Sequence, residues 1–329
     1  MADCHDLFED YYETIRLGGT KRDALKTSRR ENRKRIKEHF RENLGKEAPR
    51  FCGQGSYPMH TIITPEDGDY DLDDGVYLQG LGTDPKKWPT AATVHRWVVD
   101  AVSGYTKEPP QDKNRCVRVR YAADYHIDLP IYAMNADDKP MIFDKSADEP
   151  YESDPRAFTE WYQNAVNSKG AQMRHVTRYL KAWRDHHRSG GAGAASGLGF
   201  TILAVENFVA KEDRDDLAFA ETVKGIYRHM EGVGTIKKPT FPFEDLTSWW
   251  DETKRGNFLD KLESLRNRCV EAIEEEDKSV AARIWKRRVF GYRFPDFDDD
   301  GKGDRGAPAG PSVLRTPAPA ILGSDERSA

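Results

Sequence analysis

Two aspartates spaced two residues apart, Asp71 and Asp73, are the side chains of this sequence best suited to chemistry. They follow a glycine-serine turn at Gly55-Ser56. In an extended strand, residues two apart project from the same face, so the two carboxylates would lie side by side. Such a pair is costly unless a cation lies between the carboxylates, and hard oxygen ligands suit Mg²⁺ or Mn²⁺. The pattern therefore predicts a divalent-metal site on a strand.

A third carboxylate, Asp128, lies in a second strand-like segment, residues 121–133. Alternation would place His126, Asp128 and Pro130 on one face of that strand, and the apolar residues between them on the other. Two neighbouring strands can thus bring three carboxylates to a pair of metal ions. A metal pair of this kind holds both the attacking and the leaving oxygen of an in-line phosphoryl displacement.

The same aspartates have two simpler interpretations. Residues 67–74 are acidic and punctuated by glycine, as solvated turns often are. Tyr70, Leu72 and the run 76–78 supply the apolar and aromatic positions that a plain loop lacks, which favours a strand. A calcium-binding loop is the second alternative, but no ligand series with a closing glutamate follows.

The order of these motifs resembles the DNA polymerase β superfamily of nucleotidyltransferases. The wording of residues 54–56 (Q-G-S), 70–75 (Y-D-L-D-D-G) and 126–130 (H-I-D-L-P) is most similar to the cGAS/DncV-like nucleotidyltransferases of bacteria. Those enzymes make cyclic di- or trinucleotides in anti-phage (CBASS) signalling. The resemblance covers residues 50–205, and it implies a bilobal α+β, polymerase β-like fold with a mixed-sheet catalytic lobe and a helical C-terminal lobe.

The resemblance also implies an activity and its partners. The protein would be a nucleotidyltransferase that takes NTPs, ATP among them, and releases pyrophosphate. Two Mg²⁺ or Mn²⁺ ions would be held by Asp71, Asp73 and Asp128, with Asp128 as the candidate general base. The product would activate a downstream effector, and a regulator or a conjugation enzyme would act on the C-terminal tail.

Phosphate binding is expected first at Gly55-Ser56. A glycine turn that leads into a helix exposes backbone N–H groups, and the serine hydroxyl adds a donor for β- and γ-phosphates. The resemblance places Gln54 in the same wall of the site. A second phosphate contact is implied at Lys181, because R-Y-L-K-A-W at 178–183 resembles the family helix that carries a triphosphate-binding lysine.

The nucleotide base has a candidate partner in Phe200. In the resembling family, a serine followed by an aromatic residue begins the corresponding helix and contacts phosphate and base. Here Gly199-Phe200 stands in that place, with Ser196 and Thr201 nearby, so Phe200 and Thr201 are the predicted nucleotide-binding residues. The glycine-rich stretch before them is expected to be a connector, since no lysine follows it in Walker spacing.

Pattern and composition divide the chain into four parts. We expect bracing helices in residues 1–50, the catalytic core in 51–150, a helical lobe in 151–294, and in 295–329 a tail too polar to fold. Thr20 is the expected N-cap of the second helix. Helices are predicted at 6–17, 21–50, 93–102, 155–167, 171–187, 198–210, 215–230 and 254–288.

Composition bounds the class of protein. The 329 residues carry a net charge of −5, and the four cysteines form no C-x-x-C pair, so they are expected to be reduced thiols rather than zinc ligands. No apolar run reaches the ~20 residues that a membrane-spanning helix needs, and the N-terminus lacks the apolar stretch of a signal peptide. We therefore expect a soluble cytoplasmic protein with no membrane partner.

Residues 21–50 depart from this acidic balance, with twelve Lys or Arg against five Asp or Glu. Such a helix can bind nucleic-acid phosphates or form the solvated face of a packed helix. The absence of base-stacking aromatics in it favours the packed helix.

Two other functions stay open at this point. One is an RNA-tailing or small-molecule nucleotidyltransferase of the same superfamily, and the other is a non-catalytic RNA-binding module. The three intact carboxylates argue against the second. The bases, ring size and linkage of a cyclic product cannot be read from the sequence.

Overall fold

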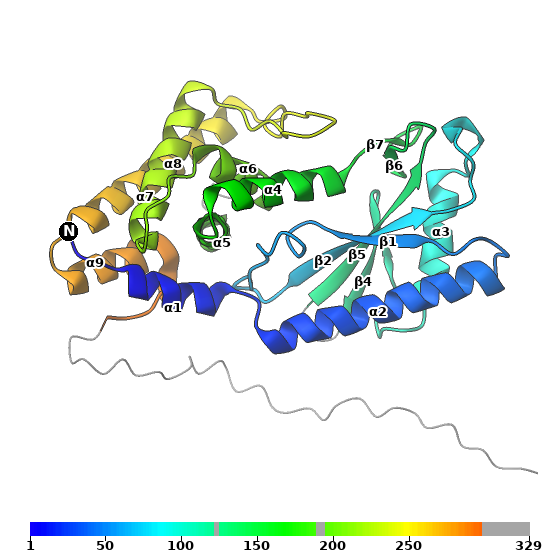
Figure 1. The fold of residues 1–329 in the computed structure, drawn as a ribbon, viewed down its shortest axis with the longest axis horizontal. Coiled ribbons are helices and arrows are strands. Elements are labelled where there is room, and N and C mark those ends of the chain that lie inside the picture. The colour runs from blue at the N-terminus through cyan, green and yellow to red at the C-terminus, as the bar shows by residue number, and fades with distance from the viewer. Residues whose placement is uncertain (122–124, 189–194, 298–329) are drawn as a thin grey trace, which may run out of the picture.

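The protein consists of a lobe built on a β-sheet and a lobe of packed helices, joined by the two N-terminal helices (Figure 1). The computed structural model describes residues 1–121, 125–188 and 195–297. The helices are α1 (His5–Ile15), α2 (Gly19–Glu42), α3 (Ala91–Val102), α4 (Pro155–Lys169), α5 (Gln172–His187), α6 (Gly197–Asn207), α7 (Asp215–Gly232), α8 (Glu252–Glu274) and α9 (Lys278–Ile284). The strands are β1 (Arg50–Gln54), β2 (Tyr70–Leu78), β3 (Gln111–Asp112), β4 (Cys116–Tyr121), β5 (Tyr125–Met134), β6 (Pro140–Ile142) and β7 (Tyr151–Glu152).

The described strands form one mixed sheet in the order β1-β2-β5-β4-β3, with β6 paired to β5 and β7 to β6. β2 and β5 run parallel, whereas the other pairs are antiparallel. The register places Asp73 beside Asp128 and Asp71 beside His126. Because paired residues project from the same face, the three predicted carboxylates share one face of the sheet.

The other face of the sheet is mostly apolar and is covered by α2 and α3. Leu72 and Val76 of β2 pack there with Leu25 and Ile36 of α2 and with Val98 of α3, all fully buried or nearly so. This alternation is what the sequence pattern of β2 predicted. It leaves the carboxylate face free for the helical lobe.

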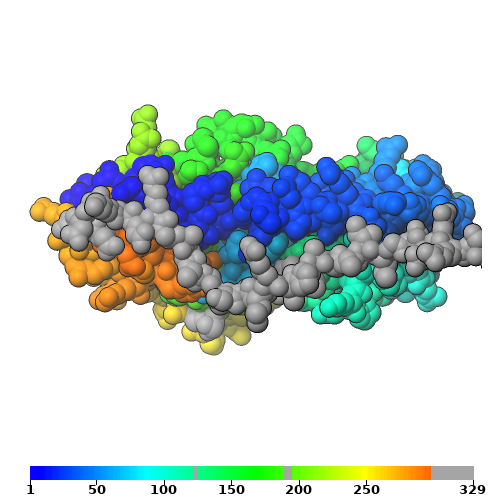
Figure 2. Space-filling view, turned by 90° about the horizontal axis from the view of Figure 1, so that it is seen from below, coloured from blue at the N-terminus to red at the C-terminus, as the bar shows by residue number. Residues whose placement is uncertain are grey.

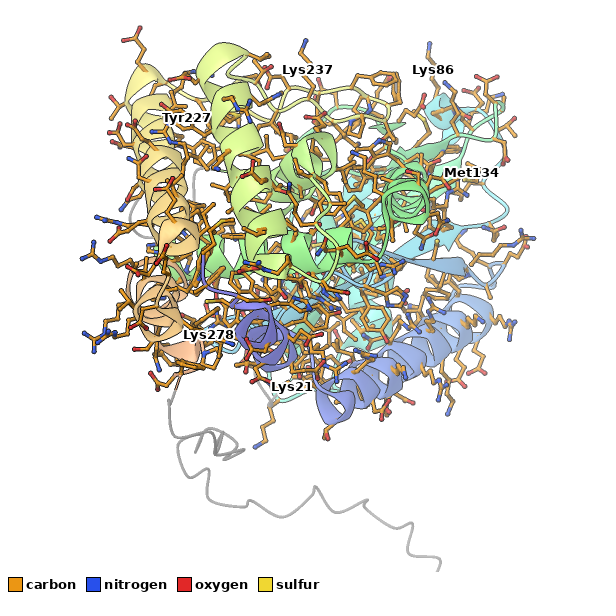
Figure 3. The ribbon with its side chains drawn as sticks, turned by 60° about the vertical axis from the view of Figure 1, so that its left-hand side comes forward. Lys21, Lys86, Met134, Tyr227, Lys237 and Lys278 are labelled. Atoms are coloured by element: carbon orange, nitrogen blue, oxygen red, sulfur yellow. The ribbon has the colours of Figure 1, made fainter. Side chains whose placement is uncertain are left out.

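α1 packs with the helical lobe, although α2, which follows it, packs on the sheet. Phe8 of α1 is fully buried, with ring centroids 5.1 Å from Tyr179 and 5.0 Å from Trp285. Lys278, labelled in Figure 3, pairs with Asp6 at 2.7 Å and ties α1 to α9. Figure 2 shows the two N-terminal helices running end to end along one side of both lobes.

Much of the positive charge of α2 is used inside the molecule. Arg33 donates two hydrogen bonds to the fully buried carboxylate of Asp74, at 2.7 and 2.5 Å. Arg35 lies over the ring of Tyr105 and pairs with Glu31 on its own helix. These contacts favour the packed-helix interpretation of the basic segment.

Several predictions of element boundaries were wrong. α2 begins at Gly19 with Gly18 as its N-cap, so Thr20 lies inside the first turn and does not cap it. The same helix ends at Glu42 rather than at residue 50, which begins β1. The helix predicted over 254–288 is two helices, because the side chain of Asp277 accepts from the N–H groups of Ser279 and Val280 and starts α9 anew. A π-helical turn, Trp285–Phe290, follows α9, and α6 ends at Asn207 rather than at residue 210.

Within the described parts of the chain, every helix is too short or too polar to cross a bilayer. The four cysteines are free thiols. The predicted tail lies outside the described residues from 298 onward, as does most of the glycine-rich connector (189–194).

Candidate active site

A cleft of about 540 Å³ lies between the sheet lobe and the helical lobe. The predicted site residues that line it are Gly55, Ser56, Asp71, Asp73, Lys181 and Thr201. The first four come from the sheet lobe and the last two from α5 and α6. Residues far apart in the sequence thus meet at one cavity, as the phosphate and metal predictions required.

Asp71 and Asp73 present a concentrated negative charge to this cleft. Asp71 is exposed there, whereas Asp73 is partly buried. Burial, and then repulsion from Asp71 and Asp128, raises the pKa of Asp73 well above its ordinary value. A divalent cation would relieve this repulsion, so the oxygen donors of the pair fit such an ion.

Asp128 is held by an arginine that the sequence analysis did not single out. Both its carboxylate oxygens accept hydrogen bonds from Arg118, at 2.7 Å each, across the β4–β5 pair. Protonating Asp128 would break this pair, which opposes the predicted role as a general base. The sequence shows Arg118 as a charged residue within β4, but only the register of the two strands places it opposite Asp128.

Among the described residues, no group of three or more His, Cys, Asp or Glu side chains is arranged to hold a metal ion. Asp71 and Asp73 form a pair of donors rather than a set of three, because Asp128 is turned to Arg118. Asp128 would join them as a ligand only by exchanging the guanidinium for the ion.

Gly55 is required by its neighbour Asp73. Its φ is +70°, and a Cβ at this position would lie 2.3 Å from Oδ2 of Asp73. The helix expected after this turn is absent: residues 55–60 form successive turns, closed by a 2.9 Å bond from the N–H of Thr61 to the carbonyl of Ser56. Any phosphate cradle here therefore depends on a turn rather than on a helix N-terminus.

Lys181 reaches across the cleft from α5 to the sheet lobe. Its Nζ donates to the hydroxyl of Thr61 at 3.0 Å and more weakly to the carbonyl of the same residue at 3.4 Å. Burial lowers the pKa of Lys181 to about 8, against the attraction of Asp71. Arg178, three residues earlier on α5, lies over the ring of Tyr12 and is not among the residues that line the cleft.

The predicted stacking role of Phe200 is contradicted by its position. Phe200 has no exposed surface and packs with ring centroids 5.9 Å from both Trp183 and Phe258. The next residue, Thr201, borders the cleft, although it too has no exposed surface and its hydroxyl donates to the carbonyl of Gly197 at 2.8 Å. Ser196 is the N-cap of α6.

Gln54 lies behind the cleft rather than in its lining. It is buried, and its Nε2 donates to the hydroxyl of Tyr132 at 3.3 Å. Its Oε1 would lie 3.1 Å from a Cβ at Gly75, so the amide packs tightly under β2. Gln54 contacts the strand that carries the carboxylates, and a direct role in nucleotide binding stays a prediction.

Three comparisons with known proteins bear on this site. Residues 49–132, which hold β1 and β2 and most of β5 with all three aspartates, match the family model for the nucleotidyltransferase domain of DncV-like cyclic GMP-AMP synthases. A cyclic GMP-AMP synthase of Escherichia albertii is 26% identical over 292 residues, covering 84% of this chain and 62% of that protein. The chain is similar to the cGAS/DncV-like nucleotidyltransferases.

Further relatives agree with this assignment. A cyclic GMP-AMP synthase of Vibrio cholerae serotype O1 is 26% identical over 303 residues, covering 71% of this chain and 65% of that protein. The crystal structure of apo DncV from Vibrio cholerae superposes with a TM-score of 0.77 at 19% identity, covering 89% of this chain and 96% of that one. This likeness confirms the α+β, polymerase β-like fold. The chain spans less than two thirds of the length of either curated relative.

Several residues that line the cleft were missed by the sequence analysis. Arg184 lines the cleft on the helical side, and Lys238 and Glu244 come from the connection between α7 and α8. In Figure 1 this connection reaches from the helices towards β6 and β7, and its Phe241 lies under Lys139 at 5.4 Å. No motif marks these residues, because only the path of the connection brings them to the cleft.

Proposed function

We propose that this chain joins nucleoside triphosphates into a cyclic di- or trinucleotide and releases pyrophosphate at each transfer. One observation carries the proposal: Asp71 and Asp73 face a cleft whose walls also present the Gly55-Ser56 turn and Lys181. Carboxylates for a cation and donors for phosphates in one cavity are the parts that nucleotidyl transfer needs. The relatives named cyclic GMP-AMP synthase support the cyclic product.

The residues of the chain act mainly by position and charge. The Gly55-Ser56 turn forms one wall of the site for the triphosphate. Gly55, which lies closest to Asp73, has no side chain there, and Ser56 contributes its hydroxyl. Lys181 opposes it with an ammonium group from α5. Holding the donor nucleotide between these walls aligns its α-phosphorus with the hydroxyl of the acceptor ribose.

Asp71 and Asp73 would hold Mg²⁺ or Mn²⁺, and Asp128 would complete the site after release from Arg118. Two such ions, when bound, neutralise phosphate charge and lower the pKa of the attacking hydroxyl. The protein contributes the oxygen ligands and the repulsion between Asp71 and Asp73 that favours a bound cation.

The biological setting rests on the resemblance to the family. We propose ATP among the substrates, a cytoplasmic location, a cyclic-nucleotide-activated effector downstream, and a role in anti-phage signalling. The division into bracing helices, a catalytic core at 51–150, a helical lobe and a tail is part of the same proposal, as is a regulator or conjugation enzyme acting on the tail.

The test is incubation of the full chain with four labelled NTPs and Mg²⁺ or Mn²⁺, followed by phosphatase and nuclease treatment and mass spectrometry. Phosphatase-resistant cyclic species are expected from the wild type. Asp71→Asn and Asp73→Asn each remove a charge that the cation needs and are expected to reduce product by at least about a hundredfold. Asp260→Asn, an exposed aspartate on α8, is the matched control and is expected to keep wild-type activity.

Circular dichroism and thermal melting would establish that the two active-site variants remain folded. Wild-type product formation by Asp71→Asn or Asp73→Asn would contradict the assigned site. Linear tails on added RNA, in place of cyclic species, would identify an RNA-tailing enzyme of the same superfamily.

A further inference from the structure

We infer that Arg184 is a second phosphate-binding residue of the cleft and contacts the triphosphate of the bound nucleotide. The inference rests on the proposed function, and it adds a residue that neither the sequence motifs nor the comparisons assign. Arg184 follows Lys181 by three positions on α5, so the two side chains lie on neighbouring parts of one helix face. Both line the cleft.

The backbone of Arg184 and one of its nitrogens are fixed, while the rest of its guanidinium is free. Its Nε donates to the carbonyl of Ala195 at 2.8 Å, which orients the planar group. In the described part of the chain, neither η nitrogen has a hydrogen-bond or ion-pair partner. A guanidinium held in this way offers two parallel donors, the geometry that suits a phosphate group.

Within residues 1–121, 125–188 and 195–297, no acidic side chain forms an ion pair with Arg184, although Asp185 attracts its charge. The neighbouring Asp185 is engaged elsewhere, since its carboxylate accepts from the N–H of Glu66 at 2.7 Å and from Arg293 at 3.4 Å. Arg184 is half-buried, and burial lowers its pKa. An unpaired, partly desolvated cation is unfavourable until an anion reaches it.

The position of Arg184 near the end of α5 does not by itself account for this arrangement. A cation in the last turn is favoured by the helix dipole. Arg188, one turn further on, meets that preference while facing out of the cleft, where it pairs with Asp67 at 2.7 Å. Arg184 instead faces the cavity that holds Lys181 and Ser56, opposite the carboxylate pair.

The experiment measures equilibrium binding, by calorimetry, of non-hydrolysable ATP and GTP analogues and of AMP and GMP, all with Mg²⁺. For Arg184→Gln we expect affinity for the triphosphates to fall about tenfold or more, with monophosphate affinity unchanged within about twofold. Arg184→Lys keeps the charge and is expected to lose less affinity for the triphosphates than Arg184→Gln does. Arg268→Gln, which alters a partly exposed arginine on α8 that pairs with Glu271, is the matched control and is expected to bind as the wild type does.

Each outcome decides the matter. Equal losses for monophosphates and triphosphates, or no loss at all, would overturn the inference while leaving the proposed function in place. A wild type that binds none of these nucleotides would overturn the proposed function and this inference with it. If Arg184→Gln melts at a lower temperature than Arg268→Gln, the same ligands are measured with Arg184→Lys instead. The inference then requires that Arg184→Lys lose affinity for the triphosphates alone.

Discussion

Lys181 is a residue of the cleft whose charge changes with pH not far above neutrality. Its ammonium is buried against Thr61, and burial lowers its pKa to about 8. In the free protein Lys181 is therefore charged below pH 8 and increasingly neutral above it. Because an anionic triphosphate binds the charged form of Lys181, the affinity for NTPs should depend on pH.

We predict that affinity for a non-hydrolysable NTP falls as pH rises through about 8, approaching a tenfold loss per pH unit well above it. Lys181→Arg carries a group that stays charged over this range and should remove that dependence. Calorimetric titrations from pH 7 to 10 measure it, with the exposed Lys37→Arg on α2 as a control. An identical slope for Lys181→Arg and the wild type would contradict the role given to Lys181.

At the scale of elements, the docking of α2 on the sheet depends on a buried ion pair. Asp74 is fully buried on the face of β2 opposite Asp73, and Arg33 is its charged partner. Removing Arg33 would leave an uncompensated carboxylate in the core. Breaking a buried pair from one side costs more than replacing both partners by apolar side chains.

We predict that Arg33→Met lowers the free energy of unfolding by about 3 kcal/mol, the low end for buried pairs because Arg33 is partly exposed. The double variant Arg33→Met/Asp74→Leu should recover at least about half of that loss. Urea unfolding followed by circular dichroism measures both. A double variant no more stable than Arg33→Met would mean that the loss comes from packing of the arginine stem.

The same scale shows how far local sequence patterns could predict this fold and site. Strands β2 and β5 were predictable because alternation of apolar and acidic residues is a local property, and the alternation also placed Asp71 and Asp73 together. The pairing of Arg118 with Asp128 was not predictable, because it depends on the register of two strands. Register is set by contacts across the sheet rather than by either strand alone.

Helix faces set a similar limit. Phe200 and Thr201 are adjacent in sequence, yet on α6 they are turned about 100° apart. Both are fully buried, but only Thr201 borders the cleft, whereas Phe200 packs in the core. The motif located the right turn of the helix but not the right residue. The cations of α5 show the same limit, since the basic pattern of that helix does not indicate that Arg184, rather than Arg178, lines the cleft.

At the scale of the whole molecule, the segment between the Gly55-Ser56 turn and β2 ties the two lobes together. The N–H of Glu66 donates to Asp185 of α5 at 2.7 Å, and Asp67 pairs with Arg188. Asp69, at the end of the segment, forms a 2.8 Å hydrogen bond through its carboxylate with Nδ1 of His126 of β5. The strand that carries Asp71 is thus anchored to the helix that carries Lys181, and this anchoring sets the distance between the walls of the cleft.

Arg293, beyond α9, is the cation at the centre of this connection. It is nearly buried, donates to the carbonyl of Thr64 at 2.7 Å and faces Asp185 at 3.4 Å. Arg293→Met would leave Asp185 without its cation, so residues 64–73 should open more often. We predict at least about threefold faster hydrogen–deuterium exchange there, with exchange in α6 unchanged.

Arg287→Met, which alters an exposed arginine within the π-helical segment Trp285–Phe290, is the matched control and should exchange as the wild type does. Weakened anchoring moves one wall of the cleft relative to the other, so Arg293→Met should also raise the KM for NTPs. This rise should be larger than the loss of stability, measured as the drop in melting temperature, would explain. Faster exchange spread evenly over α6 and β2 would show a general loss of stability instead. Exchange confined to residues 64–73 would establish that the two lobes are held at their working distance by this segment.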